Sequence, residues 1–159
     1  MIKIIYLIIF FIGILVAKEV DVDIQADSFL ANKSKNLIVF KGNVSMVKAE
    51  DTLVCQELVV HTKINPDTNK TVMRQYVATG DVSFTIAQPN TLFIGNGDKV
   101  DYNIEKQLYI ITGNAYLEDR NGSKILRGDR IYVNQKTGTT KIDGKKNQPV
   151  KFQFKMETK

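Results

Sequence analysis

Apolar and polar positions alternate along most of the chain after residue 18. The pattern is clearest in "LIVFKGNVSMV", "TLVCQELVVHT", "YVATGDVSFTI" and "QLYIITGNAYLE", which begin at Leu37, Thr52, Tyr76 and Gln107. These runs are rich in β-branched and aromatic residues, and period-two alternation is typical of strands with one dry face. None of the chain after residue 18 carries an apolar stripe with a 3.6-residue period. We therefore predict an all-β protein.

The strand pattern repeats. In "ADSFLANKSKNLIVFKGNV", "GDKVDYNIEKQLYIITGNA" and "GDRIYVNQKTGTTKIDGKK", an Asp and a later Gly are fifteen residues apart, and an Asn follows the Asp by five. The Asp–Gly pairs are Asp27–Gly42, Asp98–Gly113 and Asp129–Gly144. A degraded copy has Gln56 in the Asp position and closes at Gly80, with an extra polar stretch, "KINPDTNKT". The Asn suits a turn, since it tolerates positive φ and hydrogen-bonds nearby backbone.

The closing glycines follow one another at 38, 33 and 31 residues, a spacing typical of stacked supersecondary units. A Gly within a strand marks a bulge or a bend. The same bend in every unit would fold the stack into two facing sheets with an apolar seam. The fold predicted is a twisted open β-jellyroll of about four stacked antiparallel units of ~31–42 residues.

Even steps from each Gly select the residues that face the seam, because side chains alternate along a strand. Val44, Met46, Val82, Phe84, Ala115 and Leu117 share a side with Phe40 and Ile111, whereas their odd neighbours are polar. The residue before each Asp position is small: Ala26, Cys55, Gly97 and Gly128. Cys55, the only cysteine, is therefore interpreted as a small buried residue.

The first seventeen residues have a different pattern. Lys3 precedes a run without charge from Ile4 to Ala17, which as a helix would span about 21 Å, short of the ~30 Å hydrocarbon core. This is typical of a secretory signal peptide cleaved near Ala17, with an uncleaved membrane anchor as the alternative. The predicted organisation is a signal peptide at 1–17, a β domain at 18–148, and a C-terminal edge strand or tail at 149–159.

Charge and composition argue against most chemistry. The net charge is +5, spread along the chain without an Arg-rich or aromatic-basic run, so nucleic-acid binding is not predicted. His61 is the only histidine, which disfavours His-rich metal sites and serine–histidine pairs. Asp27, Asp98 and Asp129 could converge as catalytic carboxylates in a polysaccharide-active β-solenoid, which is the enzyme alternative. We predict no enzyme activity, no metal and no cofactor.

The repeats, and above all "LRGDRIYVNQKTGTTKIDG", resemble the LptA (OstA-like) family of lipopolysaccharide-transport proteins over nearly all of the chain after the signal. The resemblance implies a periplasmic, non-catalytic bridge that assembles head to tail and carries lipopolysaccharide from the inner to the outer membrane. The implied partners are lipopolysaccharide, an inner-membrane LptC-like protein, an outer-membrane LptD-like translocon and further copies of the chain.

Two alternatives stay open: a membrane-tethered LptC-like member of the pathway, and a structural β-solenoid whose seam is filled by its own side chains. The bridge interpretation places acyl chains against the apolar seam, for which plain core packing is the competing explanation. The candidate lipid-binding residues are Phe29, Phe40, Val44, Met46, Leu58, Val82, Phe84, Val100, Tyr102, Ile111, Leu117 and Ile131.

Overall fold

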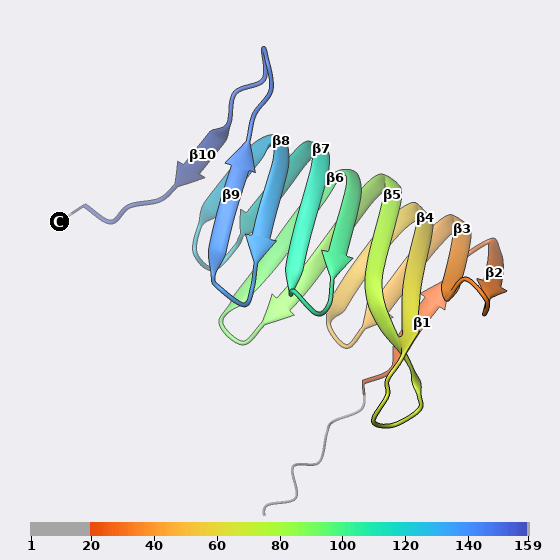
Figure 1. Cartoon of the computed structure of the whole chain (residues 1–159). Helices are drawn as coiled ribbons and strands as arrows, with labels where there is room; N and C mark the ends of the chain where they lie inside the picture. Colours follow the sequence, from red (N-terminus) through yellow and green to blue (C-terminus); the bar gives the residue numbers. More distant parts are fainter. Residues whose placement is uncertain (1–19, 159) are drawn as a thin grey trace, which may run out of the picture.

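A computed structural model describes residues 20–158, whose regular elements are all strands, as the alternating pattern predicts (Figure 1). The strands are β1 (Val22–Gln25), β2 (Ser28–Asn32), β3 (Leu37–Lys48), β4 (Asp51–Ile64), β5 (Thr71–Gln88), β6 (Thr91–Asn103), β7 (Leu108–Asp119), β8 (Lys124–Asn134), β9 (Thr139–Asp143) and β10 (Lys151–Phe154). Within this part of the chain no helix is long and apolar enough to cross a membrane. The predicted signal peptide, 1–17, lies outside the described residues.

The ten strands form one antiparallel sheet in the order β1-β3-β4-β5-β6-β7-β8-β10. Each long strand pairs with the next one along the chain. At one end of the sheet, β2 pairs with the first half of β3 and β1 with the second half. At the other end, β10 and β9 divide β8 in the same way. Short strands thus cover both halves of each terminal long strand.

The long strands bend where the repeated glycines lie. Gly42–Asn43, Gly80–Asp81 and Gly113–Asn114 sit inside β3, β5 and β7, and both residues of each pair have positive φ. Glycine, asparagine and aspartate are the residues that adopt this conformation most readily. The pairing register shifts at these same positions, so the predicted bulges are confirmed. They line up across the sheet and bend it along one line.

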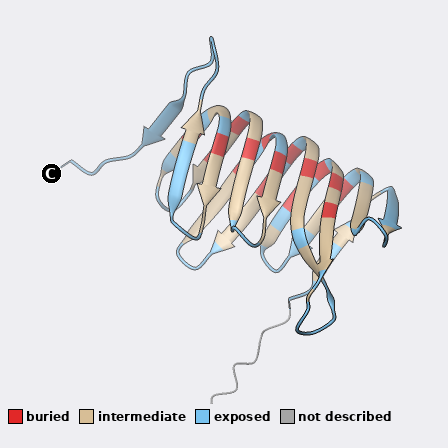
Figure 2. Ribbon diagram, in the orientation of Figure 1, coloured by how far each residue is buried: buried red, intermediate tan, exposed pale blue. Residues whose placement is uncertain are grey.

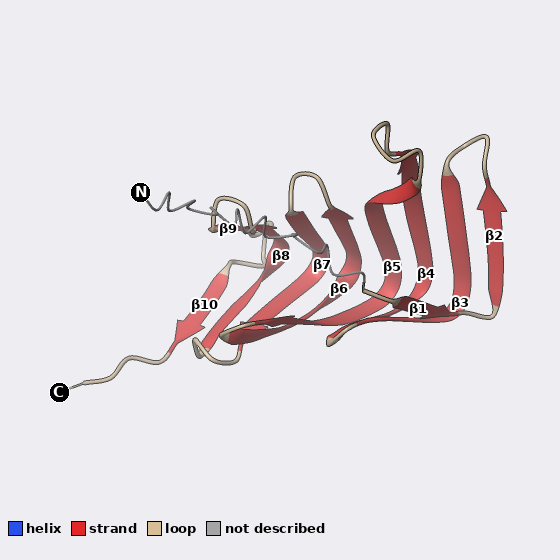
Figure 3. Cartoon of the chain, turned by 90° about the horizontal axis from the view of Figure 1, so that it is seen from below, coloured by secondary structure: helices blue, strands red, loops and turns tan. Residues whose placement is uncertain are grey.

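The bend divides the sheet into two facing halves, which we call wall A and wall B (Figure 3). Wall A comprises residues 28–41, 57–79, 99–112 and 130–143, and wall B comprises residues 22–25, 44–55, 82–97, 115–128 and 151–154. The hairpin between β4 and β5 extends wall A furthest. Part of the "KINPDTNKT" surplus lengthens these two strands, and only residues 65–70 form the loop.

The fifteen-residue spacing brings an Asp against a Gly on neighbouring strands at the bend. Asp27 donates its backbone N–H to the Gly42 carbonyl at 2.9 Å, and its carboxylate accepts from Asn43 Nδ2 at 2.9 Å. A Cβ added to Gly42 would lie 2.3 Å from Asp27 Oδ2, so a larger residue does not fit there. In the same way, a Cβ added to Gly113 would lie 2.2 Å from Asp98 Oδ2.

The degraded and final copies of the repeat behave differently from each other. Gln56 takes the place of the Asp. A Cβ added to Gly80 would lie 2.7 Å from the Cβ of Gln56, about as close as the added Cβ atoms lie to the Asp Cβ atoms in the intact copies. Asp129 and Gly144 do not meet: Gly144 packs against the Gln148 carbonyl, and Asp129 pairs with Lys145 at 3.3 Å. The equivalence predicted for this last pair is therefore wrong, because the chain leaves the sheet after Asp143 instead of crossing the bend.

The Asn at offset five opens three hairpins through its side chain. Its Oδ1 accepts a hydrogen bond from the backbone N–H three residues later. The pairs are Asn32 with Lys35 at 3.0 Å, Asn103 with Lys106 at 2.9 Å and Asn134 with Thr137 at 3.0 Å. Positive φ falls four residues after each Asn, at Asn36, Gln107 and Gly138. The hydrogen bond, and not a positive φ of the Asn itself, explains its recurrence.

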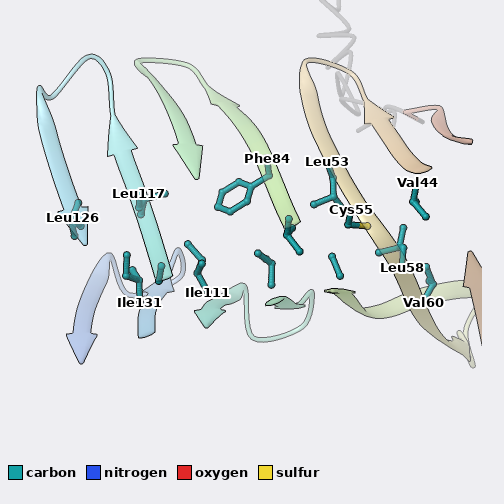
Figure 4. Packing of buried hydrophobic residues seen from close by; sticks show 14 residues of the cluster. Val44, Leu53, Cys55, Leu58, Val60, Phe84, Ile111, Leu117, Leu126 and Ile131 are labelled. Carbon is teal, nitrogen blue, oxygen red and sulfur yellow. The ribbon is translucent and has the colours of Figure 1, made fainter. Parts of the chain in front are cut away.

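The hydrophobic core lies between the two walls (Figures 2 and 4). Every buried side chain in residues 20–158 is apolar. The core consists of Val44, Leu53, Cys55, Leu58, Val60, Ala78, Val82, Phe84, Val100, Ile111, Ala115, Leu117, Leu126 and Ile131. These residues come from both walls and from every strand between β3 and β8, so the seam extends along most of the sheet.

Candidate functional site

The structure places most of the predicted seam residues between the walls. Eight are buried: Val44, Leu58, Val82, Phe84, Val100, Ile111, Leu117 and Ile131. Phe40 and Met46 are half-buried and pack against this core, and Tyr102 is half-buried beside it. These side chains face the seam because side chains alternate between the two faces of a strand. Their contact with lipid stays a prediction.

Phe29 is an exception, because 65% of its surface is exposed. It lies on β2, which pairs only with β3, and its ring centroid is 5.6 Å from that of Phe40. Phe29 therefore belongs to the open edge of the sheet and not to its closed core.

The small residues before the Asp positions let the walls approach each other at the bend. A Cβ on Gly97 would lie 2.7 Å from Ile111 Cγ2, and one on Gly128 would lie 2.6 Å from Ile142 Cγ2. Cys55 occupies the equivalent place and is 1% exposed. Burial raises the pKa of its thiol to about 11, which leaves it protonated and unreactive at neutral pH.

The three carboxylates of the enzyme alternative are spread along the sheet. Asp27 and Asp98 lie four strand spacings apart, about 19 Å, and Asp98 and Asp129 lie two apart, about 10 Å, whereas glycosidase carboxylates are separated by ~5–9.5 Å. Asp27 is held by Asn43 and Asp129 by Lys145. His61 follows the buried Val60 on the alternate, outward face of β4, opposite in direction to Cys55. Across residues 20–158, no three His, Cys, Asp or Glu side chains are grouped to hold a metal ion.

An apolar groove runs between the walls and is only partly filled. Beside Met46 and Tyr76 it contains a hollow of about 70 Å³, beside Ile86 and Val133 one of about 210 Å³, and beside Leu126 one of about 450 Å³. Neighbouring hollows share lining side chains, so they are successive parts of one groove. The groove leads from β3 and β4 toward β10, where Phe152 forms part of its wall.

The mouth of the groove carries charges of both signs, while its floor is apolar. Lys48 and Asp51 lie at the mouth beside the smallest hollow, and Asp119 and Lys124 lie beside the largest. A polar hollow of about 540 Å³ exists on the outer face of wall B, lined by Arg127 and several amide side chains. It shares no lining residue with the three hollows of the groove and is lined by more polar side chains, so the groove is the candidate site for an apolar ligand.

Three tyrosines form a ladder on wall A. Tyr76, Tyr102 and Tyr109 are directly paired across β5, β6 and β7. The rings of Tyr102 and Tyr109 stack with centroids 3.9 Å apart, and those of Tyr76 and Tyr102 with centroids 6.1 Å apart. Burial raises the pKa of Tyr109, and the nearby Tyr102 and Asp51 raise it further. These hydroxyls therefore stay neutral, as an apolar groove requires.

Sequence reasoning identified Tyr102 but missed Tyr76 and Tyr109. Both lie four residues before a closing glycine, Gly80 and Gly113 respectively. The even-step rule that selected Ile111 would have selected them if it had been carried one step further back.

A second close contact shapes wall B. Phe84 pairs directly with Gly95 on β6, and a Cβ on Gly95 would lie 2.1 Å from the Phe84 ring. The far end of the ring therefore lies over the glycine and fills the space that a side chain there would occupy. This fixes Phe84 in the middle of the groove, where Figure 4 shows it between the walls.

Comparisons with known proteins agree with this geometry. The sequence model of the family described as LptA/(LptD N-terminal domain) LPS transport protein matches residues 23–139. Among solved structures, the fold is similar to that of LptH from Pseudomonas aeruginosa, the LptA-homologous periplasmic component of its lipopolysaccharide transport device. The TM-score is 0.71 at 11% identity, over 86% of this chain and 96% of that one. No curated protein sequence gave a significant match. Because the family model covers well over half of the sequence, the chain belongs to the LptA/LptD N-terminal domain family of lipopolysaccharide transport proteins.

Proposed function

We propose that this chain is a periplasmic, non-catalytic carrier that binds lipopolysaccharide by its acyl chains in the groove between walls A and B. The observation that carries the proposal is an apolar groove between the walls whose part toward β8 and β10 the chain's own side chains do not fill. Each acyl methylene removed from water contributes about 0.8 kcal/mol, so a partly sheltered chain is held strongly. Sugars and phosphates would remain outside the mouth, among the charged side chains there.

The two ends of the sheet support assembly into a bridge from the inner to the outer membrane. The first end exposes Phe29 and Leu30 on β2, and the last exposes Phe152 and Phe154 on β10. Unpaired strand edges are sites for strand addition by another chain. We therefore propose head-to-tail contacts between copies, with an LptC-like protein and an LptD-like translocon using the same edges at the two membranes.

Site-specific photo-crosslinking in cells tests the carrier proposal. A photoreactive residue replaces Phe84, which is 6% exposed and points into the groove. The matched control is its neighbour Ser83, which is exposed on the outer face. We expect lipopolysaccharide to be captured at position 84 and not at 83. If folded, exported protein captures lipid at neither position, the seam is an ordinary core and the scaffold alternative holds.

Sequencing the N-terminus of the mature protein purified from the same cells tests the tethered LptC-like alternative. A mature protein that begins after Ala17 supports the exported carrier. Retention of residues 1–17 on a functional chain would establish the anchored form instead.

A further inference from the structure

The groove changes width along its length. The hollow beside Met46 and Leu53 has a volume of only about 70 Å³, whereas those beside Val133 and Leu126 have about 210 and 450 Å³. Sites for small organic ligands typically have volumes of roughly 300–1,000 Å³. The part of the groove next to β3 and β4 is thus nearly filled by the chain itself, and the part next to β8 and β10 is not.

Three side chains separate the narrow part from the wide part. Phe84, Ile86 and Tyr109 line both the 70 Å³ hollow and the 210 Å³ hollow. Tyr109 comes from wall A, whereas Phe84 and Ile86 come from wall B. They approach from opposite sides of the groove, so together they form a constriction.

The constriction is held in place from behind on both walls. The Tyr109 ring stacks on Tyr102, with ring centroids 3.9 Å apart. The Phe84 ring lies against the backbone of Gly95, with no side chain between them. Moving either ring aside would break these contacts and force a neighbour out of its place, because a packed interior has few alternative arrangements.

We propose that Tyr109, with Phe84 and Ile86, divides the groove, and that a bound molecule places its fatty acyl chains on the side toward β10. This inference rests on the proposed carrier function. It adds where in the groove the acyl chains lie and names Tyr109 as the residue that determines this position. An acyl chain enters the wide part without displacing protein side chains. The narrow part would admit it only after Tyr109 moved, so each copy of the chain holds its ligand near one end.

Photo-crosslinking of purified full-length mature protein with lipopolysaccharide tests this division. Photoreactive residues are placed at Met46, on the narrow side, and at Thr140, which lines both wide hollows. We expect capture at Thr140 to exceed capture at Met46 by about tenfold. This is the ratio expected if an acyl chain buries roughly two fewer methylenes on the narrow side than on the wide side. Equal capture at the two positions overturns the division but leaves the carrier function standing. Capture at neither position, in folded protein, overturns the carrier function itself.

A substitution in the constriction tests its residue assignment. Tyr109→Leu removes the ring, and we expect capture at Met46 to rise to within about twofold of that at Thr140. Tyr132→Leu is the matched control on the outer face of the same wall, and it should leave the ratio unchanged. Tyr109→Phe keeps the ring in a chain with a near-native core, and it should also keep the ratio. If Tyr109→Leu folds, as shown by its circular dichroism, and the ratio does not change, Tyr109 is not the barrier.

Discussion

The contact between Gly113 and Asp98 at the bend gives the sharpest test of the fold. Gly113 has φ +78°, and a Cβ there would lie 2.2 Å from Asp98 Oδ2 and 2.8 Å from Asp98 Cβ. Because the Cβ of Asp98 is fixed to the backbone, rotating its carboxylate does not relieve the conflict. Gly113→Ala therefore combines a positive-φ cost of about 1–2 kcal/mol with an overpacking cost of about 1–3 kcal/mol.

Gly138 separates these two contributions. It has φ +70°, but a Cβ there would meet nothing within 4 Å. We expect Gly138→Ala to lower the free energy of unfolding by about 1–2 kcal/mol, and Gly113→Ala to lower it by about 2–5 kcal/mol. For a protein of this size the second change corresponds to a melting temperature about 4–20 °C lower. Urea denaturation followed by circular dichroism measures both free energies.

A double mutant then tests the partner. In a chain that carries Asp98→Gly, Gly113→Ala should cost no more than Gly138→Ala, because the obstructing side chain is gone. If Gly113→Ala and Gly138→Ala cost the same in the natural background, the fifteen-residue spacing does not reflect a packed Asp–Gly contact. The reasoning about the bend would then be refuted.

Further predictions concern the core and two titrating groups. Ile111→Ala, at a fully buried position, should cost about 2–5 kcal/mol in urea denaturation, whereas Val54→Ala, 50% exposed on the outer face, should cost about 0.5 kcal/mol or less. Cys55, whose pKa burial raises to about 11, should react with a thiol reagent at pH 8 far more slowly in folded protein than in urea, and equal rates would contradict its burial. Although partial burial acts to raise the pKa of Asp119, hydrogen bonds that include one from Thr91 hold it below its ordinary value. Its contribution to stability is therefore present above the unfolded pKa and lost as pH falls through the folded one. Thr91→Val should raise the pKa of Asp119 in an NMR titration, and an unchanged value would contradict the role of this hydrogen bond.

Local pattern was enough to predict the strands, the bend and the direction of most seam side chains. Gly42–Asn43 and Gly113–Asn114 bend the sheet because few other residue pairs adopt positive φ so easily, and this requirement is visible in sequence. The end of the repeat was not predictable in the same way. Asp129 and Gly144 keep the spacing, yet they separate because β9 ends at Asp143 and the chain leaves the sheet. Spacing records how strands pair, and it contains no information on where pairing stops.

The width of the groove depends on residues that the repeat leaves free to vary. The positions four residues before the closing glycines face the groove and are occupied by Ile38, Tyr76, Tyr109 and Thr140. The bend requires particular residues because its backbone has positive φ and its atoms are in contact, whereas a seam position requires only a side chain that tolerates burial. The series includes Tyr109 at the constriction and a threonine beside the widest part of the groove. A regular backbone can thus carry a groove of irregular capacity, and the departures from the repeat, more than the repeat itself, determine where a ligand fits.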